Sequence, residues 1–579
     1  MRINIHSPYR NSSARRESRR NRARRLTIRG VCMIALLWAA LTPPASAQRT
    51  SSAAPSGALA KQIEKLLDHP DVREAQWGVS VISMKRNAAL VSHNQSKLFI
   101  PASTAKLFPA AAALSLLGSD YRYKTTISLD RGSKSTNSVD VSSQSASDSG
   151  SELSSEWIGD LILTGRGDPN LSGRILPFDK ETQRDPTPSR IFGALAEAVA
   201  ARGIRIVTGD LIADDRYFVH APYGQGWEYD DLMWLAAAPA SALAINDNVI
   251  YMSIFPDAPG APAIVQVQPM PGYYEIDNKV LTVGRTEPTP GGGVRRTRRS
   301  LGLGREPGSM RLQMWGEIPV GAAESSYAIS IEDPPRFAAE YLRQELAKAG
   351  VEIKGRVLVR RQEVSEVENL AGAPTKAPGS AAERTPAQKS GDEQVVSLIL
   401  AEHESGPLAE SLRVMLKVSQ NLHAEMLLRT LGRERRGVGS AEAGIAAIND
   451  FLAGNGIATN GVALRDGSGL SRQNMVSPAA MTALLKHMYQ SEHGAAWTAL
   501  LSEAGVDGTL RNRLRGRYTT ARVWAKTGSL QGVATLAGYV ANQSNDLLAF
   551  TIFANHYNDD EGSVMTVIDQ IVTALARSR

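Results

Sequence analysis

The stretch Ile100-Pro101-Ala102-Ser103-Thr104-Ala105-Lys106-Leu107-Phe108, followed by an apolar run at 110–117, is the segment from which the fold can be inferred. Residues three apart lie on the same face of a helix, so Ser103 and Lys106 are expected one turn apart where this helix begins. A serine hydroxyl needs an adjacent base to become a nucleophile, and a lysine that burial or a second cation keeps neutral is such a base. Ser103 and Lys106 are therefore a candidate nucleophile and base.

Pro109 bears on the geometry of this pair. A proline inside a helix removes a backbone hydrogen bond, so we expect the helix to be kinked or interrupted just after Lys106. Free backbone N–H groups at the helix start would favour a negative charge developing beside Ser103. Ser-x-x-Lys is a weak signal alone, because chains of this length contain chance matches, but this is the only copy in the sequence.

A second motif, Val418-Ser419-Gln420-Asn421-Leu422, lies in a short polar break between helices expected at 408–417 and 422–431. A hydroxyl and a carboxamide presented from such a turn can relay a proton and bind a substrate amide. Ser-x-Asn is common, and further matches begin at Ser92 and Ser135, so this motif counts only in its context.

The third motif is Lys526-Thr527-Gly528-Ser529, at the end of an expected strand that enters a turn. Strand residues alternate between faces, which places Lys526 and Gly528 on one side and Thr527 on the other. Gly528 has no side chain to keep a substrate backbone away. Lys526 can hold an anion and lower the proton affinity of Lys106, and the Thr527 and Ser529 hydroxyls can bind a carboxylate.

The basic character of the chain comes from its first residues. Residues 1–47 contain ten of the 65 Lys and Arg residues and one of the 58 acidic residues, which leaves 55 basic against 57 acidic residues in the remainder. The remainder has no basic excess and no nucleic-acid-binding motif, so we expect no nucleic-acid partner.

Residues 1–47 are predicted to be a secretory signal peptide. A basic segment through Arg29 precedes an apolar stretch at 31–41, and Ala45-Ser46-Ala47 provides a small-residue cleavage site. The alternatives are a retained membrane anchor, for which the apolar run is short, and twin-arginine export. We expect an exported, periplasmic protein.

The only cysteine, Cys32, lies in this leader. Cleavage would leave no cysteine, which excludes disulfides, thiol catalysis and cysteine-ligated metals from the mature chain. The nine histidines show no metal-binding spacing in a helix, so neither a metal nor a cofactor is expected.

The middle of the chain changes in character. A helix is expected at 57–69 and a β-hairpin at 77–92, whereas short strands dominate from 121 to 318. A Ser-rich stretch at 132–155 and a Gly/Arg loop at 291–308 interrupt these strands. We interpret the loop as solvated and flexible, with contact to an anionic polymer as the alternative.

A helix and a linker separate these strands from the second motif. The pattern at 332–350 predicts an amphipathic helix, and 351–360 reads as a strand. Residues 371–394, rich in Pro, Ala, Gly, Ser and Lys, are expected to form a linker before the helices around Ser419.

Ser-x-x-Lys, Ser-x-Asn and Lys-Thr-Gly, in this order, are the motif set of penicillin-binding proteins and related serine β-lactamases. The sequence resembles the D-alanyl-D-alanine carboxypeptidase/endopeptidases among the low-molecular-mass class C penicillin-binding proteins, peptidase family S13. Three further stretches sharpen the resemblance, which covers nearly all of the mature chain: 164–169, 227–231 with 238–243, and 466–472.

The resemblance implies an α/β (α+β) multidomain fold. Residues 57–120 and 395–579 would form a transpeptidase-like catalytic domain, an antiparallel sheet flanked by helices as in serine β-lactamases. Residues 121–370 would form two nested β-rich insert domains, which fill the long gap between Ser103 and Ser419.

The resemblance also implies serine acyl transfer on peptidoglycan stem peptides. Ser103 would attack the carbonyl between two terminal D-alanines with Lys106 as base, and water would release the acyl-enzyme. Ser419 would pass a proton to the leaving amine, while Asn421 would orient the substrate amide and Lys106. β-Lactam antibiotics would be covalent inhibitors of the same serine.

Binding roles follow from the same resemblance. The backbone N–H groups of Ser103 and Ser529 would form the oxyanion hole, and Lys526, Thr527 and Ser529 would hold the terminal carboxylate. Three further residues stand where relatives acting on diaminopimelate-containing walls recognise that side chain, with structural pairing as the alternative. These residues are Asp168, Arg472 and Gln531.

Two other functions remain open from sequence. A serine β-lactamase or esterase uses the same machinery but needs an efficient deacylating base, and no Glu-x-x-Leu-Asn stretch between the first two motifs supplies one. A non-catalytic cell-wall-binding protein would suit the inserted domains, although a pure binder has no need of Ser103, Lys106 and Lys526 together. Peripheral association with the cell wall fits either function, and the sequence predicts no particular oligomeric state.

Overall fold

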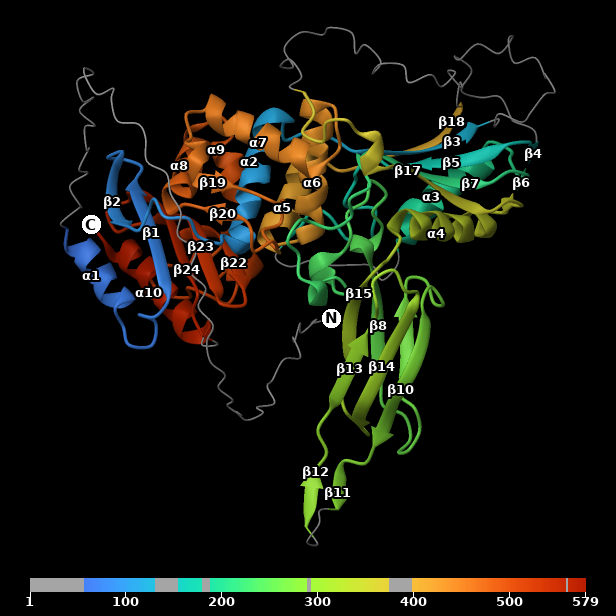
Figure 1. Ribbon diagram of the computed structural model, residues 1–579, viewed down its shortest axis with the longest axis horizontal. Helices are drawn as coiled ribbons and strands as arrows, with labels where there is room; N and C mark the ends of the chain where they lie inside the picture. The colour runs from blue at the N-terminus through green and yellow to red at the C-terminus, as the bar shows by residue number, and fades with distance from the viewer. Residues whose placement is uncertain (1–56, 131–154, 180–187, 289–292, 374–397, 559–560) are drawn as a thin grey trace, which may run out of the picture. The chain divides into compact units, whose positions relative to one another are not determined.

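Figure 1 shows the computed structural model of the protein. The structure describes residues 57–130, 155–179, 188–288, 293–373, 398–558 and 561–579. The predicted signal peptide with Cys32, nearly all of the Ser-rich stretch and most of the predicted linker lie outside these ranges. Within them, no helix has the length and apolar character that crossing a membrane requires.

A 6-stranded antiparallel sheet underlies the part of the chain that carries the three motifs (Figure 1). Its strand order is β2-β1-β24-β23-β22-β21, and β1 pairs along its whole length with β24, so the two ends of the described chain share one sheet. The strands are β1 (Gln76–Ser83), β2 (Ala88–His93), β21 (Ser502–Glu503), β22 (Val523–Leu530), β23 (Val533–Ala541) and β24 (Leu547–Asn555).

Helices cover both faces of this sheet. Along β24, Phe550 and Ile552 belong to one buried cluster and Ala549 and Phe553 to another, because successive strand residues point to opposite faces. The first cluster includes α1 (Ala58–Leu67) and α10 (Glu561–Arg577). The second includes α2 (Leu107–Leu116), α5 (Leu408–Lys417), α6 (Asn421–Arg436), α7 (Ala441–Gly454), α8 (Pro478–Gln490) and α9 (Gly494–Leu500).

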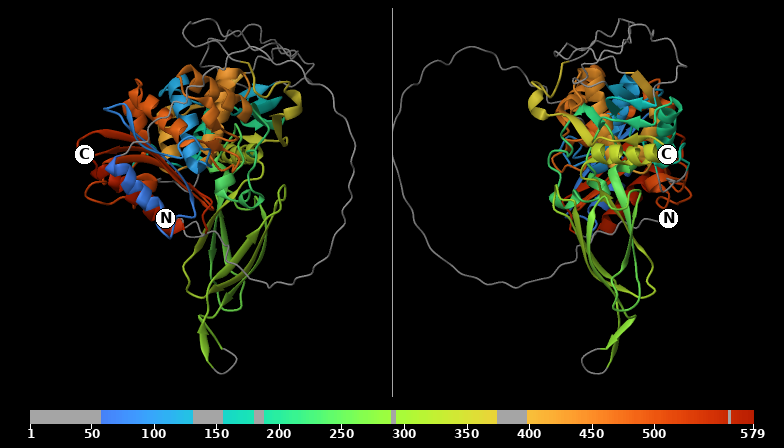
Figure 2. Two further views of the ribbon diagram at one scale, coloured as in Figure 1. Left: turned by 60° about the vertical axis from the view of Figure 1, so that its left-hand side comes forward. Right: turned by 90° about the vertical axis from the view of Figure 1, so that its right-hand side faces the viewer.

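A second sheet, of 5 strands in the order β17-β7-β5-β3-β18, is built from the inserted residues. Helices α3 (Ser189–Ala201) and α4 (Pro334–Lys348) pack together against it (Figure 2). Its strands are β3 (Lys124–Asp130), β5 (Asp160–Thr164), β7 (Leu211–Val219), β17 (Val357–Gln362) and β18 (Leu398–Glu404), and a small sheet joins β4 (Glu156–Trp157), β6 (Ile206–Val207) and β16 (Glu352–Ile353).

The remaining inserted strands form two three-stranded sheets that lie side by side and a two-stranded sheet at their far end (Figures 1 and 2). The sheets are β15-β8-β9, β10-β14-β13 and β11-β12, and a further pair outside the insert, β19 and β20, comes directly before α8 in the chain. The strands are β8 (Val249–Phe255), β9 (Ile264–Gln268), β10 (Glu275–Val283), β11 (Thr286–Pro288), β12 (Val294–Arg296), β13 (Ser300–Gly304), β14 (Arg311–Pro319), β15 (Ser325–Ser330), β19 (Val462–Ala463) and β20 (Met475–Val476).

The predicted fold class is confirmed: a helix-flanked antiparallel sheet carries β-rich insertions. The helix expected at 57–69, the hairpin at 77–92 and the helix at 332–350 are present as α1, β1–β2 and α4. One cluster of buried apolar side chains runs through both groups of inserted strands, from Ile127 to Ala401. The division of the insert into two separate domains stays a prediction.

The structure corrects two details. The segment predicted as a Gly/Arg loop, 291–308, contains β12 and β13 instead, since backbone pairing with β11 and β14 outweighs its poor strand composition. Strand β18 falls in the range assigned to the catalytic domain, yet it pairs antiparallel with β3 in the inserted sheet. The insert therefore begins and ends on adjacent strands.

Phe553→Ala tests the packing of the catalytic sheet. Phe553 is fully buried and its ring centroid lies 6.0 Å from that of Phe99. We expect a loss of about 3–5 kcal/mol in the free energy of unfolding, because a large cavity would form. Denaturant unfolding measures it. The control is Ile158→Ala, at a side chain 72% exposed, where a comparable loss would contradict the assignment of the core.

Candidate active site

The segment that carries Ser103 is held at the end of the sheet. The Ile100 N–H donates to Asn555 Oδ1 at 2.7 Å, and Asn555 Nδ2 donates back to the Ile100 carbonyl at 3.2 Å. A 3₁₀-helix, η1 (Ala102–Lys106), follows. Side chains three apart eclipse each other in a 3₁₀-helix, so Ser103 and Lys106 stack.

Where Pro109 predicts a kink or an interruption just after Lys106, the structure has a change of helix type without a gap. The 3₁₀ turn ends at Lys106 and the α-helix α2 begins at Leu107. Pro109 therefore occupies the first turn of α2, where a backbone N–H would have no partner within the helix. The proline fits this position, and the tight turn before it carries the two predicted reacting groups.

The amine of Lys106 touches three polar groups from three elements. Nζ lies 2.8 Å from Ser103 Oγ, 2.6 Å from Asn421 Oδ1 and 2.6 Å from the carbonyl oxygen of Ser468. The side-chain oxygen of Asn421 and the carbonyl oxygen of Ser468 can only accept hydrogen bonds. In the neutral amine, its two N–H groups therefore go to these acceptors, and the lone pair is left for the hydroxyl of Ser103.

Burial lowers the pKa of Lys106 from 10.5 to about 7, and the charges of Asp466 and Glu425 oppose this shift. Desolvation disfavours the charged form of an amine, and nearby carboxylates favour it. A pKa near 7 leaves a large share of the side chain neutral at neutral pH. Lys106 is therefore able to act as a general base.

The second motif forms the turn between α5 and α6. Ser419 adopts a left-handed backbone, with φ of 64°, and its Oγ accepts a hydrogen bond from Lys526 Nζ at 2.9 Å. Burial lowers the pKa of Lys526 well below its usual value, and the charge of Lys106 lowers it further. The structure thus brings the first, second and third motifs together, as predicted.

Inserted residues hold this turn from the other side. Asn421 Nδ2 donates to the Ala236 carbonyl at 2.7 Å, and Gln420 Nε2 donates to Asp247 Oδ2 at 2.9 Å. Asp247 is also paired with the buried Arg174 at 2.7 Å. The chain around Asp247 is strained, with positive φ angles at three successive residues, Asn246, Asp247 and Asn248.

The third motif lies on β22 directly beside Ser103. An added Cβ at Gly528 would lie 2.8 Å from the Ser103 nitrogen and 2.3 Å from Thr535 Oγ1, so only glycine allows this approach. Thr527 Oγ1 donates to Thr509 Oγ1 at 2.8 Å, and Ser529 Oγ donates to Glu561 Oε1 at 2.5 Å. These hydroxyls border a cavity of about 170 Å³.

The three predicted side-chain recognition residues are not all together. Arg472 Nη1 donates to the Gln531 carbonyl at 3.0 Å, which places these two residues side by side. Asp168 is fully buried, accepts from the Asn170 N–H at 2.8 Å and lies 3.5 Å from His403 Nε2. Its contacts are those of a structural carboxylate.

Sequence reasoning missed several groups around the site. Glu228 Oε1 accepts from Arg472 Nε at 2.7 Å, so it is the acidic neighbour of Arg472. Glu425, four residues after Asn421 on α6, is fully buried and its charge acts on Lys106. The signal available in the sequence was a charged pair four residues apart on a helix, Glu425 with Arg429, which usually marks an exposed face.

In the described ranges no cluster of His, Cys, Asp and Glu could hold a metal ion.

A Ser–Lys turn, a Ser-x-Asn turn and a Lys-Thr-Gly strand meet beside a helix-flanked antiparallel sheet. This arrangement defines the class of penicillin-binding proteins and serine β-lactamases. A solved structure, penicillin-binding protein 4 (dacB) from Haemophilus influenzae, shares the fold with a TM-score of 0.68 and 24% identity, covering 89% of this chain and 99% of that one. The sequence matches the D-Ala-D-Ala carboxypeptidase 3 (S13) family over residues 59–377 and 386–577, and the chain belongs to this family.

Two relatives agree with this assignment. The chain is 32% identical to the D-alanyl-D-alanine carboxypeptidase of Actinomadura sp. (strain R39), over 97% of this chain and 92% of the relative. It is 26% identical to D-alanyl-D-alanine carboxypeptidase DacB of Haemophilus influenzae, over 82% and 84% of the two chains. Its activity class is that of the family, D-Ala-D-Ala carboxypeptidase.

Lys106→Met should change how stability depends on pH. The pKa of Lys106 is about 7 when folded and 10.5 when unfolded, so the unfolded state binds the proton more tightly and stability rises with pH between these values. We expect the stability difference between wild type and variant to shift by about 2 kcal/mol in favour of wild type from pH 6.5 to 9. Urea unfolding at both pH values measures this shift. Lys61→Met, at an exposed position on α1, is the control, and equal pH dependence in both variants would refute the assignment.

Proposed function

We propose that the chain cleaves the terminal D-Ala-D-Ala bond of peptidoglycan stem peptides, and the equivalent bond of peptide cross-links, through an acyl-enzyme on Ser103. The observation that carries the proposal is the environment of Lys106. Asn421 Oδ1 and the Ser468 carbonyl accept its two N–H groups, so the nitrogen lone pair is directed at Ser103 Oγ, 2.8 Å away. A serine with such a base is an activated nucleophile.

Acylation begins when Lys106 takes the hydroxyl proton and Ser103 Oγ bonds to the carbonyl carbon. The carbonyl oxygen becomes an oxyanion, for which the backbone N–H groups of Ser103 and Ser529 are the donors. The close approach of Gly528 to the Ser103 nitrogen supports this pairing of η1 with β22.

Collapse of the oxyanion breaks the carbon–nitrogen bond, and the leaving amine needs a proton. Ser419, whose hydroxyl is held 2.9 Å from Lys526 Nζ, supplies this proton, and the proton that Lys106 took from Ser103 replaces it, so that Lys106 is neutral again. Lys526, Thr527 and Ser529 hold the terminal carboxylate, and Asn421 orients the substrate amide. In the second half of the reaction, neutral Lys106 takes a proton from a water molecule as the water oxygen bonds to the acyl carbon. The ester bond then breaks, Lys106 returns this proton to Ser103 Oγ, and the enzyme is free.

β-Lactam inhibition follows from the same chemistry. A solved complex of Haemophilus influenzae penicillin-binding protein 4 contains a β-lactam, and a strained cyclic amide in the same position would acylate Ser103 without releasing a leaving group. The predicted leader supports action in the periplasm, where peptidoglycan is the substrate.

Arg472 is the best-supported residue for recognising the stem-peptide side chain. It stands beside Glu228 and Gln531, so a positive and a negative group are available together for a zwitterionic diaminopimelate end. Gln531 is exposed next to the third motif. Recognition by Asp168 stays a prediction, and its burial favours the structural alternative.

Ser103→Ala tests the nucleophile. The variant should fold, because Ser103 is only partly buried and alanine is smaller. It should lose covalent labelling by a fluorescent penicillin, read on a denaturing gel. Ser115→Ala, at the far end of α2 where the hydroxyl contacts Met488 Sδ at 3.9 Å, should label normally. Labelling of Ser103→Ala would remove Ser103 from its proposed role.

Mass spectrometry of muropeptides tests the substrate. Wild type should remove one D-alanine from a disaccharide pentapeptide and split a cross-linked dimer, and penicillin should abolish both reactions. Fast turnover of nitrocefin without muropeptide cleavage would instead support a β-lactamase. Absence of both acylation and cleavage would support a wall-binding protein.

Arg472→Ala tests side-chain recognition. We expect KM for a diaminopimelate-containing pentapeptide to rise about tenfold with kcat nearly unchanged, because uniform binding is lost. A short N-acyl-D-Ala-D-Ala peptide that lacks this side chain should show unchanged kinetics. An equal loss on both peptides would mean that Arg472 supports the site only structurally.

A further inference from the structure

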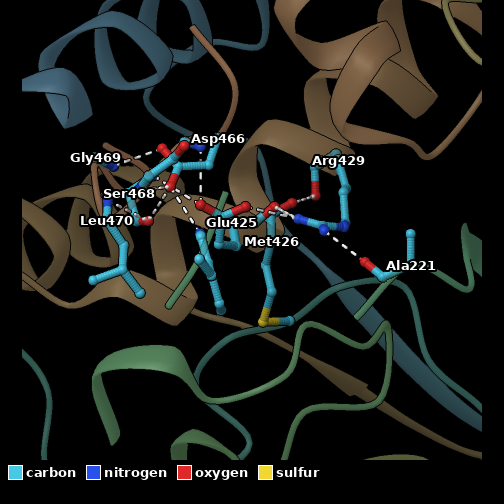
Figure 3. A network of polar contacts seen from close by, with 12 residues as sticks. Ala221, Glu425, Met426, Arg429, Asp466, Ser468, Gly469 and Leu470 are labelled. Carbon is cyan, nitrogen blue, oxygen red and sulfur yellow. Dashed lines mark hydrogen bonds and ion pairs between the residues drawn. The ribbon is translucent and has the colours of Figure 1, made fainter. Parts of the chain in front are cut away.

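Two buried carboxylates stand behind the amine of Lys106, and the mechanism above uses neither. Glu425 lies on α6 and Asp466 in the loop that follows β19, and both are fully buried. Figure 3 shows that both lie beside the segment that contains Ser468, Gly469 and Leu470. One carbonyl of this segment, that of Ser468, accepts from Lys106 Nζ at 2.6 Å.

Glu425 fixes the backbone on the N-terminal side of that carbonyl. Its Oε1 accepts from the Gly467 N–H at 2.9 Å and from the Ser468 N–H at 2.8 Å. Its Oε2 accepts from Arg429 Nη1 at 3.0 Å, and Arg429 Nη2 donates to the Ala221 carbonyl at 2.8 Å. The carboxylate is therefore oriented by three donors.

Asp466 fixes the other side. Its Oδ1 accepts from the Gly469 N–H at 2.9 Å. The Ser468 carbonyl and the Gly469 N–H belong to the same planar peptide and point in opposite directions. Holding the N–H on Asp466 therefore aims the carbonyl at Lys106. Asp466 is itself oriented by Trp227 Nε1, which donates to Oδ2 at 2.9 Å.

The aim of this carbonyl decides where the lone pair of Lys106 goes. A neutral amine has two N–H groups for three polar neighbours. If the Ser468 carbonyl moved away, one N–H would be free to donate to Ser103 Oγ, and the serine would lose its base. An acceptor held in place removes this alternative.

We propose that Glu425 and Asp466 are positioning residues for the reaction: together they hold the two peptides that flank Ser468, so that its carbonyl binds one N–H of Lys106 and the lone pair faces Ser103. The inference rests on the proposed role of Lys106 as base. The two buried carboxylates then orient the base through backbone N–H groups, without touching the substrate.

The same carboxylates act on the proton affinity of Lys106. The charged groups that face Lys106 from the elements around it are Lys526 on β22, Glu425 on α6 and Asp466 in the loop. The two carboxylates raise the pKa of Lys106 against the effect of burial. Removing one of them should therefore lower this pKa, and the acid limb of the pH–rate profile should move to lower pH.

Glu425→Gln and Glu425→Asp separate the effect of the charge of Glu425 from the effect of its side-chain length. The rate constant for acylation by a fluorescent penicillin is measured from pH 5 to 9. We expect Glu425→Gln to lower the optimum rate about tenfold and to move the acid limb down by roughly half a pH unit or more. Aspartate keeps the charge but is one methylene shorter, so Glu425→Asp should lower the rate and leave the limb in place.

The control is Asp546→Asn, at a buried carboxylate that accepts from Ser83 Oγ at 2.5 Å and from the Lys85 N–H. It should lower the melting temperature without moving the limb or the rate of the folded enzyme. If both Glu425 variants behave as this control does, the inference is overturned. The proposed function still holds in that case, provided that wild type is acylated and Ser103→Ala is not. Failure of wild type to acylate would instead overturn the proposed function.

Trp227→Phe provides a milder variant should Glu425→Gln fail to fold. It removes only the indole donor to Asp466, on a partly buried side chain. We expect the acylation rate to fall roughly threefold at an unchanged melting temperature, because a charge-assisted hydrogen bond that orients Asp466 is lost. An unchanged rate would count against the role of Asp466.

Discussion

The structure depends on the cost of burying one amine. A lysine removed from water favours its neutral form, and Lys106 meets this constraint with a carboxamide oxygen, a backbone carbonyl and a serine hydroxyl. Each partner comes from a different element, so the 3₁₀ turn, α6 and the loop after β19 must all be placed correctly at once. The surrounding helices and the sheet serve to fix these three segments against each other.

Much of this arrangement could be predicted from local patterns. Ser103 and Lys106 are three residues apart, and Pro109 marks the change of helix type, so both signals are carried by neighbouring residues. Residues 291–308 show the limit of such reasoning, because their strands depend on backbone pairing with the neighbouring strands β11 and β14, which the Gly- and Arg-rich composition does not indicate. Glu425 shows the same limit in the site: a charged pair on one helix turn looks exposed until tertiary packing covers it.

The inserted residues form sheets of their own, and some of them also hold residues of the active site in place. Ala236 and Asp247 hold the turn that carries Asn421, and Trp227 and Ala221 hold the carboxylate pair behind Lys106. Buried polar networks of this kind are costly when only partly satisfied. Loss of the insert would therefore leave donors and acceptors around the reacting groups without partners, even though none of these inserted residues meets the substrate bond.

The pairing of β1 with β24 also governs the order in which a growing chain can acquire structure. The inserted sheet is complete once β18 has been made, so this part can fold while the C-terminal strands are still being synthesised. The first hairpin must wait for Leu547–Asn555 before its open edge is covered. Lys526 arrives just as late, so the nucleophile and its neighbours are assembled only near the end of synthesis, and a truncated chain carries Ser103 without an active site around it.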